Sequence, residues 1–340
     1  LEEALQHWLD SIAVVRHLSG EKIVSTEMCR QYCLCISLWA LESLLQSGRL
    51  TEEHLNQATA ALEGLHLRAG LVEGLTGEMA LGYQLFSFDA EFFSSGPKTD
   101  PWHYLFILYA SSLGRPWRQH DRTVYLTRFT QLIQLTQQPY YQAKVKLNQW
   151  EALFQASDLQ RLKAPASELL LPGLAPASEV CATNEARLAC ARTAIALEHY
   201  RLRRGRYPDS LADLTPGFLT QIPLDPFTGK VLPYINEAGR VVVYSVGTNL
   251  RDDGASKQHG SDGFCEDIVF TLRPGEVVDL IKEGIPRTVS LTGPLSDALI
   301  KTVSSGRQAI LFINRRGFAP LAVCENCRFV LRCRMCEVPL

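Results

Sequence analysis

Residues 307–336 read RQAILFINRRGFAPLAVCENCRFVLRCRMC, and four of the ten cysteines of the chain lie in this stretch. They form two C-x2-C pairs, Cys324 with Cys327 and Cys333 with Cys336, with five residues between the pairs. A C-x2-C turn can direct two thiolates at one tetrahedral Zn²⁺, and the arginines beside these cysteines favour the thiolate form. The spacing predicts zinc binding, and the alternative is a disulfide or buried free thiols.

The same stretch resembles the bacterial replication-restart helicases known as primosomal protein N′ (PriA). The resemblance rests on the run ILFINRRGFAP at 310–320, followed closely by the two C-x2-C pairs, and it extends back to about Glu276. It implies that residues 273–340 are a truncated RecA-like helicase lobe with the start of a zinc ribbon. In that family each zinc takes one C-x2-C pair from this half of the insertion and one from a later half. The resemblance therefore implies that the two cysteine pairs belong to two different, incomplete zinc sites.

The C-terminal segment also carries the positive charge of the chain. From Arg273 onward there are ten Lys and Arg against six Asp and Glu, whereas the preceding 272 residues carry 24 against 30. Arginine can pair with phosphate in a bidentate manner, and the resemblance implies a DNA-facing or interface-facing role for Arg315 and Arg316. The alternative is that these arginines form a solvated face. DNA is the partner that this segment predicts.

The chemistry of a complete motor is missing from the sequence. No G-x4-G-K-[ST] loop and no DExH box occur, so backbone amides and a lysine to hold ATP phosphates are not provided. No Ser/His/Asp or Cys/His arrangement stands out as a nucleophilic site. We expect no autonomous catalysis.

Residues 1–157 are predicted to be helical, because apolar residues recur at helical spacing, as in Leu5–Val15 and Leu34–Leu45. Ser47-Gly48 is expected to end the second helix, and Thr51 to cap the third. Further helices are expected at 71–90, 102–112, 119–136 and 139–156. The tryptophans of this region, Trp39, Trp102, Trp117 and Trp150, are expected to be core anchors.

Three prolines make residues 158–183 a predicted linker. A helix should follow, with Asn184 as its cap and Gly205 at its end. Beyond it, short strands are predicted at 231–234, 241–244 and 268–271. Asp209 is expected to cap a short helix, and Asp225 to shape a turn.

Residues 187–271 resemble the C-terminal module of the type II secretion major pseudopilin (GspG) and related bacterial proteins. The resemblance follows the order helix, GRYP, IPLDPFTG, strand, YSVG, Asp252-Asp253-Gly254 and Asp267-Ile268. It implies a Ca²⁺ loop with Asn249, Asp253 and Asp267 as ligands, and Asp262 as a looser one. Hard oxygen ligands suit that ion. The alternative is that these residues only shape turns.

The predicted fold class is α plus α/β, with a helical region at 1–157, a linker at 158–183, an α+β pseudopilin-like module at 184–272 and the helicase fragment at 273–340. The favoured function is a helicase fragment that binds zinc and DNA in the cytoplasm. The main alternative is a non-enzymatic envelope or secretion-related protein with a calcium-binding module, and a third is a helical scaffold for protein partners. No transmembrane span is predicted. The short seam at 272–276 favours a chimera of two unrelated pieces.

Overall fold

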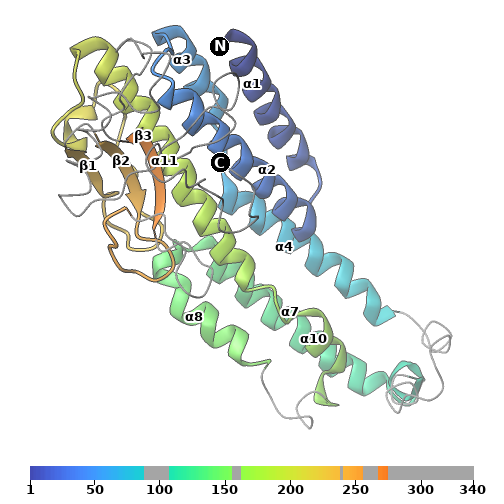
Figure 1. The fold of residues 1–340 in the computed structure, drawn as a ribbon. Helices are drawn as coiled ribbons and strands as arrows, with labels where there is room; N and C mark the ends of the chain where they lie inside the picture. Colours follow the sequence, from blue (N-terminus) through green and yellow to red (C-terminus); the bar gives the residue numbers. More distant parts are fainter. Residues whose placement is uncertain (88–106, 155–161, 238–239, 256–266, 275–340) are drawn as a thin grey trace, which may run out of the picture. The chain divides into compact units, whose positions relative to one another are not determined.

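The structure is a computed structural model that describes residues 1–87, 107–154, 162–237, 240–255 and 267–274 (Figure 1). The chain divides into two units, Leu1–Gly275 and Glu276–Leu340, and all described residues belong to the first. The predicted helicase lobe and its zinc ribbon therefore lie outside the described residues, apart from 273–274. Most described residues are helical, and a three-stranded antiparallel sheet completes the first unit.

The first four α-helices are α1 (Glu2–His17), α2 (Val24–Gln46), α3 (Glu52–Leu62) and α4 (Leu67–Gln84). Their ends confirm the local signals of the sequence. Gly48 follows α2 with a positive φ of 64°, and the Thr51 side chain accepts the amide of His54 at 3.3 Å as the cap of α3. Short 3-10 turns, Leu18–Gly20 and Leu85–Ser87, follow α1 and α4.

The next helices are α7 (Arg115–Gln137), α8 (Tyr140–Ala152), α10 (Pro165–Leu170) and α11 (Pro176–Arg204). The first two confirm the helices predicted at 119–136 and 139–156, and most of 102–112 lies outside the described residues.

The start of α11 corrects the sequence prediction. The helix begins at Pro176, eight residues before Asn184, because proline suits the first turn of a helix and its fixed φ is already helical. Asn184 is buried inside the helix and donates to Gln31 at 3.3 Å. The predicted linker at 158–183 thus contains α10 and the first turns of α11. The predicted end at Gly205 is confirmed, with a left-handed φ of 74°.

The sheet consists of β1 (Tyr234–Glu237), β2 (Arg240–Ser245) and β3 (Ile268–Pro274), in the order β1-β2-β3 and antiparallel throughout. The strands predicted at 241–244 and 268–271 are confirmed. The strand predicted at 231–234 instead begins at Tyr234, and Val231 forms only an isolated bridge with Leu224. Pro233 has no N–H to donate to a ladder, which accounts for the later start.

A short 3-10 helix, Leu211–Leu214, precedes the sheet and corrects a second predicted cap. Its cap is Ser210, whose hydroxyl accepts the amide of Ala212 at 3.2 Å. Asp209 instead pairs with Arg206 at 3.1 Å on the surface. Ser and Asp are nearly equal as caps, so the sequence alone did not separate these neighbours.

The main hydrophobic core connects the helices to the sheet, and it includes residues from Leu5 to Leu272. Helix α11 lies at its centre, in contact with α2, α3 and α4 and also with β2 and β3 (Figure 1). The outer edge of β3 is covered by α2, because Glu42 Oε1 accepts the Thr271 amide and Gln46 Nε2 donates to the Thr271 carbonyl, each at 2.8 Å. These contacts satisfy an edge strand that would otherwise offer unpaired groups. Among the described residues, no helix has the length and hydrophobicity of a membrane span.

Candidate functional site

The six residues of the predicted zinc and DNA sites lie outside the described residues. They are Cys324, Cys327, Cys333 and Cys336 for zinc, and Arg315 and Arg316 for DNA. The described unit offers three other places to consider: the turn after β2, a surface pocket between α7 and α8, and a buried polar network under α2.

The turn after β2 carries the predicted calcium ligands. The Asn249 amide nitrogen donates to Asp253 Oδ2 at 2.8 Å, and the Asn249 Oδ1 accepts the Arg251 amide at 2.9 Å. Asp267 is buried and its Oδ2 accepts the Ala255 amide at 2.9 Å. Asp262 lies outside the described residues. The structure thus brings Asn249 and Asp253 together, but both are already joined by hydrogen bonds.

The conformation of this turn is unusual for its residue types. Leu250 and Ala255 both have a φ of 60°, in the left-handed region that favours glycine. Between them, Asp252 Oδ1 accepts the Tyr244 hydroxyl at 2.8 Å and the Gly254 amide at 3.1 Å. Burial and this carboxylate raise the pKa of Tyr244 above its ordinary value. Within the described ranges, no three His, Cys, Asp or Glu residues lie close enough to hold a metal ion.

Asp225 sits beneath the same turn and has a structural role, as the sequence predicts. It is fully buried and accepts hydrogen bonds from the Phe227 amide (2.9 Å), the Ser245 hydroxyl (2.9 Å) and the Val246 amide (3.1 Å). These bonds connect the turn at 225–230 to the end of β2. Three donors from the protein thus satisfy a buried carboxylate that would otherwise be costly to remove from water.

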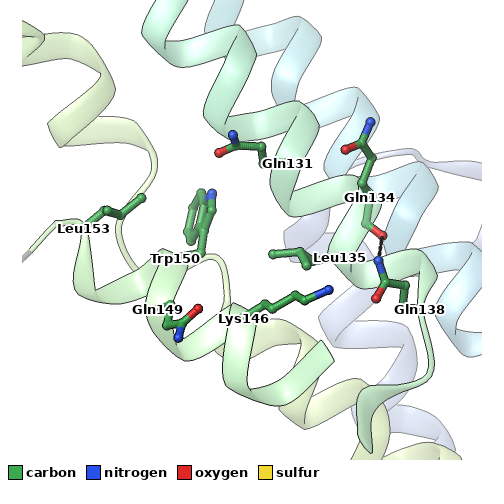
Figure 2. Close-up of a pocket in the computed structure, with 8 residues that line it drawn as sticks. All are labelled: Gln131, Gln134, Leu135, Gln138, Lys146, Gln149, Trp150 and Leu153. Carbon is green, nitrogen blue, oxygen red and sulfur yellow. Dashed lines mark hydrogen bonds between the residues drawn. The ribbon is translucent and has the colours of Figure 1, made fainter. Parts of the chain in front are cut away.

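A pocket of about 360 Å³ lies between α7 and α8 (Figure 2). Figure 2 shows Leu135 and Trp150 near its centre, with amide side chains and one ammonium group around them. The eight lining residues are Gln131, Gln134, Leu135, Gln138, Lys146, Gln149, Trp150 and Leu153. None of these is acidic, so the pocket suits a neutral or anionic group. The Trp150 indole N–H already donates to the Arg128 carbonyl at 3.0 Å, so it is not available to a ligand.

A buried polar network joins α2 to α11. Arg30 makes two hydrogen bonds of 2.7 Å to Glu27, and both side chains are almost completely buried. Gln31 donates to Glu27 at 2.8 Å and accepts from Asn184, which also accepts from Arg187 at 3.3 Å. Buried charges persist only when paired and hydrogen-bonded in this way. The sequence did not predict the network, because the two residues that join its halves are 153 positions apart.

Part of this chain is similar in sequence to replication restart proteins. No family model matches it, and no solved structure matches it. Replication restart protein PriA of Rickettsia prowazekii is 39% identical over 62 residues, which are 18% of this chain and 10% of that protein. PriA of Haemophilus influenzae is 38% identical over 85 residues, or 23% of this chain and 11% of the relative. PriA of Treponema pallidum is 43% identical over 65 residues, or 19% and 9%.

These matches cover about a tenth of the length of the curated relatives. They cover a similarly limited part of this chain, between a sixth and a quarter. The likeness is therefore to one segment of PriA. The chain contains a PriA-like segment.

Proposed function

We propose that residues 276–340 are the PriA-like segment and that they bind zinc and DNA. The observation that supports the proposal is the identity of 39–43% to PriA proteins over 62 to 65 residues. That length agrees with the span from Glu276 to Leu340, which carries the ILFINRRGFAP run and both C-x2-C pairs. Of the functions considered, a replication-restart-related segment has the most direct support.

The zinc part of the proposal follows from the donor set. Four thiols in two C-x2-C turns are a set that tetrahedral Zn²⁺ prefers, and thiolate ligands need cationic surroundings or a metal to form at neutral pH. Cys324, Cys327, Cys333 and Cys336 would hold the metal, either as one four-thiolate site or as two half-sites of two thiolates each. The role of zinc would be to order the segment, because metal binding and folding are coupled in small sites.

Zinc content of the purified full chain tests this directly. We expect stoichiometric zinc by elemental analysis, and its loss in Cys324→Ser and in Cys333→Ser. Cys29→Ser is the matched control, because Cys29 is exposed on α2 and belongs to neither pair. If the four cysteines hold one zinc, both variants abolish it; if they form two half-sites, each variant removes only part of the metal. Wild-type chain without zinc would refute the proposal.

The DNA part rests on Arg315 and Arg316. A phosphate contact made by one arginine contributes about one unit to the slope of binding against salt concentration. We expect Arg315→Ala and Arg316→Ala to weaken DNA binding and reduce that slope, whereas Arg204→Ala, an exposed arginine at the end of α11, should not. Equal effects of all three variants would mean that binding is non-specific. The proposal concerns binding and not ATP hydrolysis, and it accords with a cytoplasmic location.

Calcium binding by the turn after β2 is a second candidate. The closeness of Asn249 and Asp253, on a turn with two non-glycine residues at positive φ, supports it. To bind the ion, the Asn249 oxygen would have to turn from the Arg251 amide towards it. Such a site would use Asn249, Asp253, Asp262 and Asp267, as expected of an envelope protein with a pseudopilin-like module. A rise of the melting temperature with Ca²⁺ but not Mg²⁺, abolished by Asp253→Asn and not by Asp209→Asn, would support it. An unchanged melting temperature would exclude it.

A further inference from the structure

Helix α2 has its charged residues inside and its uncharged residues outside. Of its three charged side chains, Glu27 and Arg30 are buried and Glu42 bonds to the edge of β3. The exposed residues of α2 are all uncharged; they are Ser25, Cys29, Tyr32, Ile36, Trp39, Ala40, Ser43 and Gln46. A helix that faces solvent normally shows the opposite pattern, with charges outside. The outer side of α2 therefore lacks the charged residues that are typical of a solvent-exposed helix surface.

Large apolar side chains lie at the middle of this side. Tyr32 is 66% exposed, Ile36 47% and Trp39 55%. The expectation that Trp39 is a core anchor is wrong, because α2 is apolar around much of its circumference and Leu34, Leu38 and Leu41 take the buried side. Exposed tyrosine and tryptophan are typical of the centre of protein interfaces.

The order of the exposed residues is nearly symmetric about Ile36. Tyr32 lies four residues before it and Trp39 three residues after it, so an aromatic ring flanks it on each side. One step further out, Cys29 and Ser43 are small residues seven positions before and after. We call Cys29, Tyr32, Ile36, Trp39 and Ser43 the α2 face. Spacings of three and four residues keep all five on one side of the helix.

We propose that the α2 face is the contact surface of a homodimer, in which two α2 helices pack antiparallel about a two-fold axis near Ile36. A two-fold interface brings the same patch of both copies together, so the patch must be complementary to itself. With the axis near Ile36, Tyr32 of each copy faces Trp39 of the other. The small residues at both ends allow the helices to approach, and no charge is buried on the α2 face.

The chemistry of the face favours a second copy over a lipid surface. Helices that lie on membranes carry Lys and Arg beside their apolar side, whereas the exposed residues of α2 include neither. The exposed area limits the size of the contact. A tyrosine or tryptophan can bury about 150–250 Å², so the exposed fractions leave roughly 300–400 Å² per copy on the three large side chains. The total is below the about 1,200 Å² of a stable interface, which means a weak dimer.

Sedimentation equilibrium of the full chain tests the proposal. We expect a reversible monomer–dimer equilibrium between about 1 and 500 μM, the range of a weak interface. Ile36→Lys should raise the dissociation constant at least about a hundredfold, because each dimer then carries two unpaired charges at its centre. Val145→Lys is the matched control, since Val145 is a β-branched residue 67% exposed on α8. Both variants should melt as the wild type does, because both sites are at the surface.

A pair of complementary variants tests the arrangement itself. Tyr32→Lys and Trp39→Glu should each prevent self-association. Mixed together they should form a heterodimer, because the lysine introduced in one copy would meet the glutamate introduced in the other, while the second Tyr–Trp contact stays native. A wild-type chain that remains monomeric throughout the range would overturn the proposal, and so would a dimer that survives Ile36→Lys. Failure of the mixture to associate would overturn the antiparallel two-fold arrangement. Binding to neutral lipid vesicles without self-association would assign the face to a membrane and overturn the proposal as well.

Discussion

Replacing Gly77 with alanine probes a close approach of two backbone segments in the described unit. Gly77 lies in α4, where the helix passes the segment that leads into α2. A Cβ at this position would lie 1.6 Å from the Lys22 carbonyl oxygen and 2.8 Å from its carbonyl carbon. These are backbone atoms, so no side-chain rotation can relieve the contact.

The size of the effect follows from the distance. Non-bonded carbon contacts are favourable near about 3.5 Å, so α4 and residue 22 would have to separate by roughly 1.5–2 Å. Forced overpacking costs about 1–3 kcal/mol and sometimes more, while alanine gains about 1 kcal/mol over glycine in a helix. A Cβ 1.6 Å from a backbone oxygen places the cost at the upper end of that range. After the helix-propensity gain is subtracted, we expect Gly77→Ala to lower the free energy of unfolding by about 2 kcal/mol.

Gly74→Ala is the control, one turn earlier in the same helix. There a Cβ would lie 3.2 Å from the Ile23 carbonyl oxygen, a contact that a small shift can relieve. The gain in helix propensity is the same, and the small shift offsets most of it, so we expect stability within about 0.5 kcal/mol of wild type. Urea unfolding followed by circular dichroism at 222 nm measures both variants. If Gly77→Ala proved as stable as Gly74→Ala, the close packing of α4 against residue 22 would be refuted.

Three further predictions concern caps, buried carboxylates and pH, and urea unfolding measures each. Thr51→Ala removes the acceptor of the His54 amide, so we expect a loss of about 1 kcal/mol; no loss would mean that the cap is dispensable. Asp225→Asn places an amide N–H against the donor N–H of Val246 or of its neighbours, so we expect a loss of about 2–3 kcal/mol; an unchanged free energy would contradict the role of this carboxylate. Burial lowers the pKa of His199, so the unfolded chain binds more protons than the folded one, and stability should fall as the pH drops below about 6.5. His199→Gln should flatten that dependence, and an identical pH profile would contradict it.

Local signals in the sequence were sufficient for the helix ends at Gly48, Thr51 and Gly205 and for two strands. Gly48 and Gly205 end helices because glycine accepts a positive φ, and Thr51 caps one because its hydroxyl accepts an amide, so each signal acts within a few residues. The start of α11 was harder to predict. Prolines at 165 and 176 indicate a linker as well as they indicate first helical turns, and only packing decides between the two.

For the candidate sites, the sequence predicted which residues could act as ligands but not how their side chains are arranged. The resemblance to the pseudopilin module pointed to Asn249 and Asp253, two side chains that do meet, but it did not show that they bond to each other and to the backbone. The sequence did not predict the pocket between α7 and α8. Its glutamines are typical of a solvent-exposed helix face, and they line a pocket only because α7 and α8 pack beside each other. The predictions for Cys324 and Arg315 stay predictions, since both lie outside the described residues.

By itself the sequence determined the helical character of the first half, the zinc-type cysteine spacing and the likeness to PriA, because each depends on residues close together in the chain. Only the tertiary structure decided that α11 joins helices and sheet in one core, and that Glu42 and Gln46 cover the edge of β3 more than 200 residues away. The leucine stripe from Leu34 to Leu45 already indicated the buried side of α2. What the sequence did not show is that Tyr32 and Trp39 on the opposite side remain exposed, because only the elements that pack around a helix decide how much of its circumference they cover.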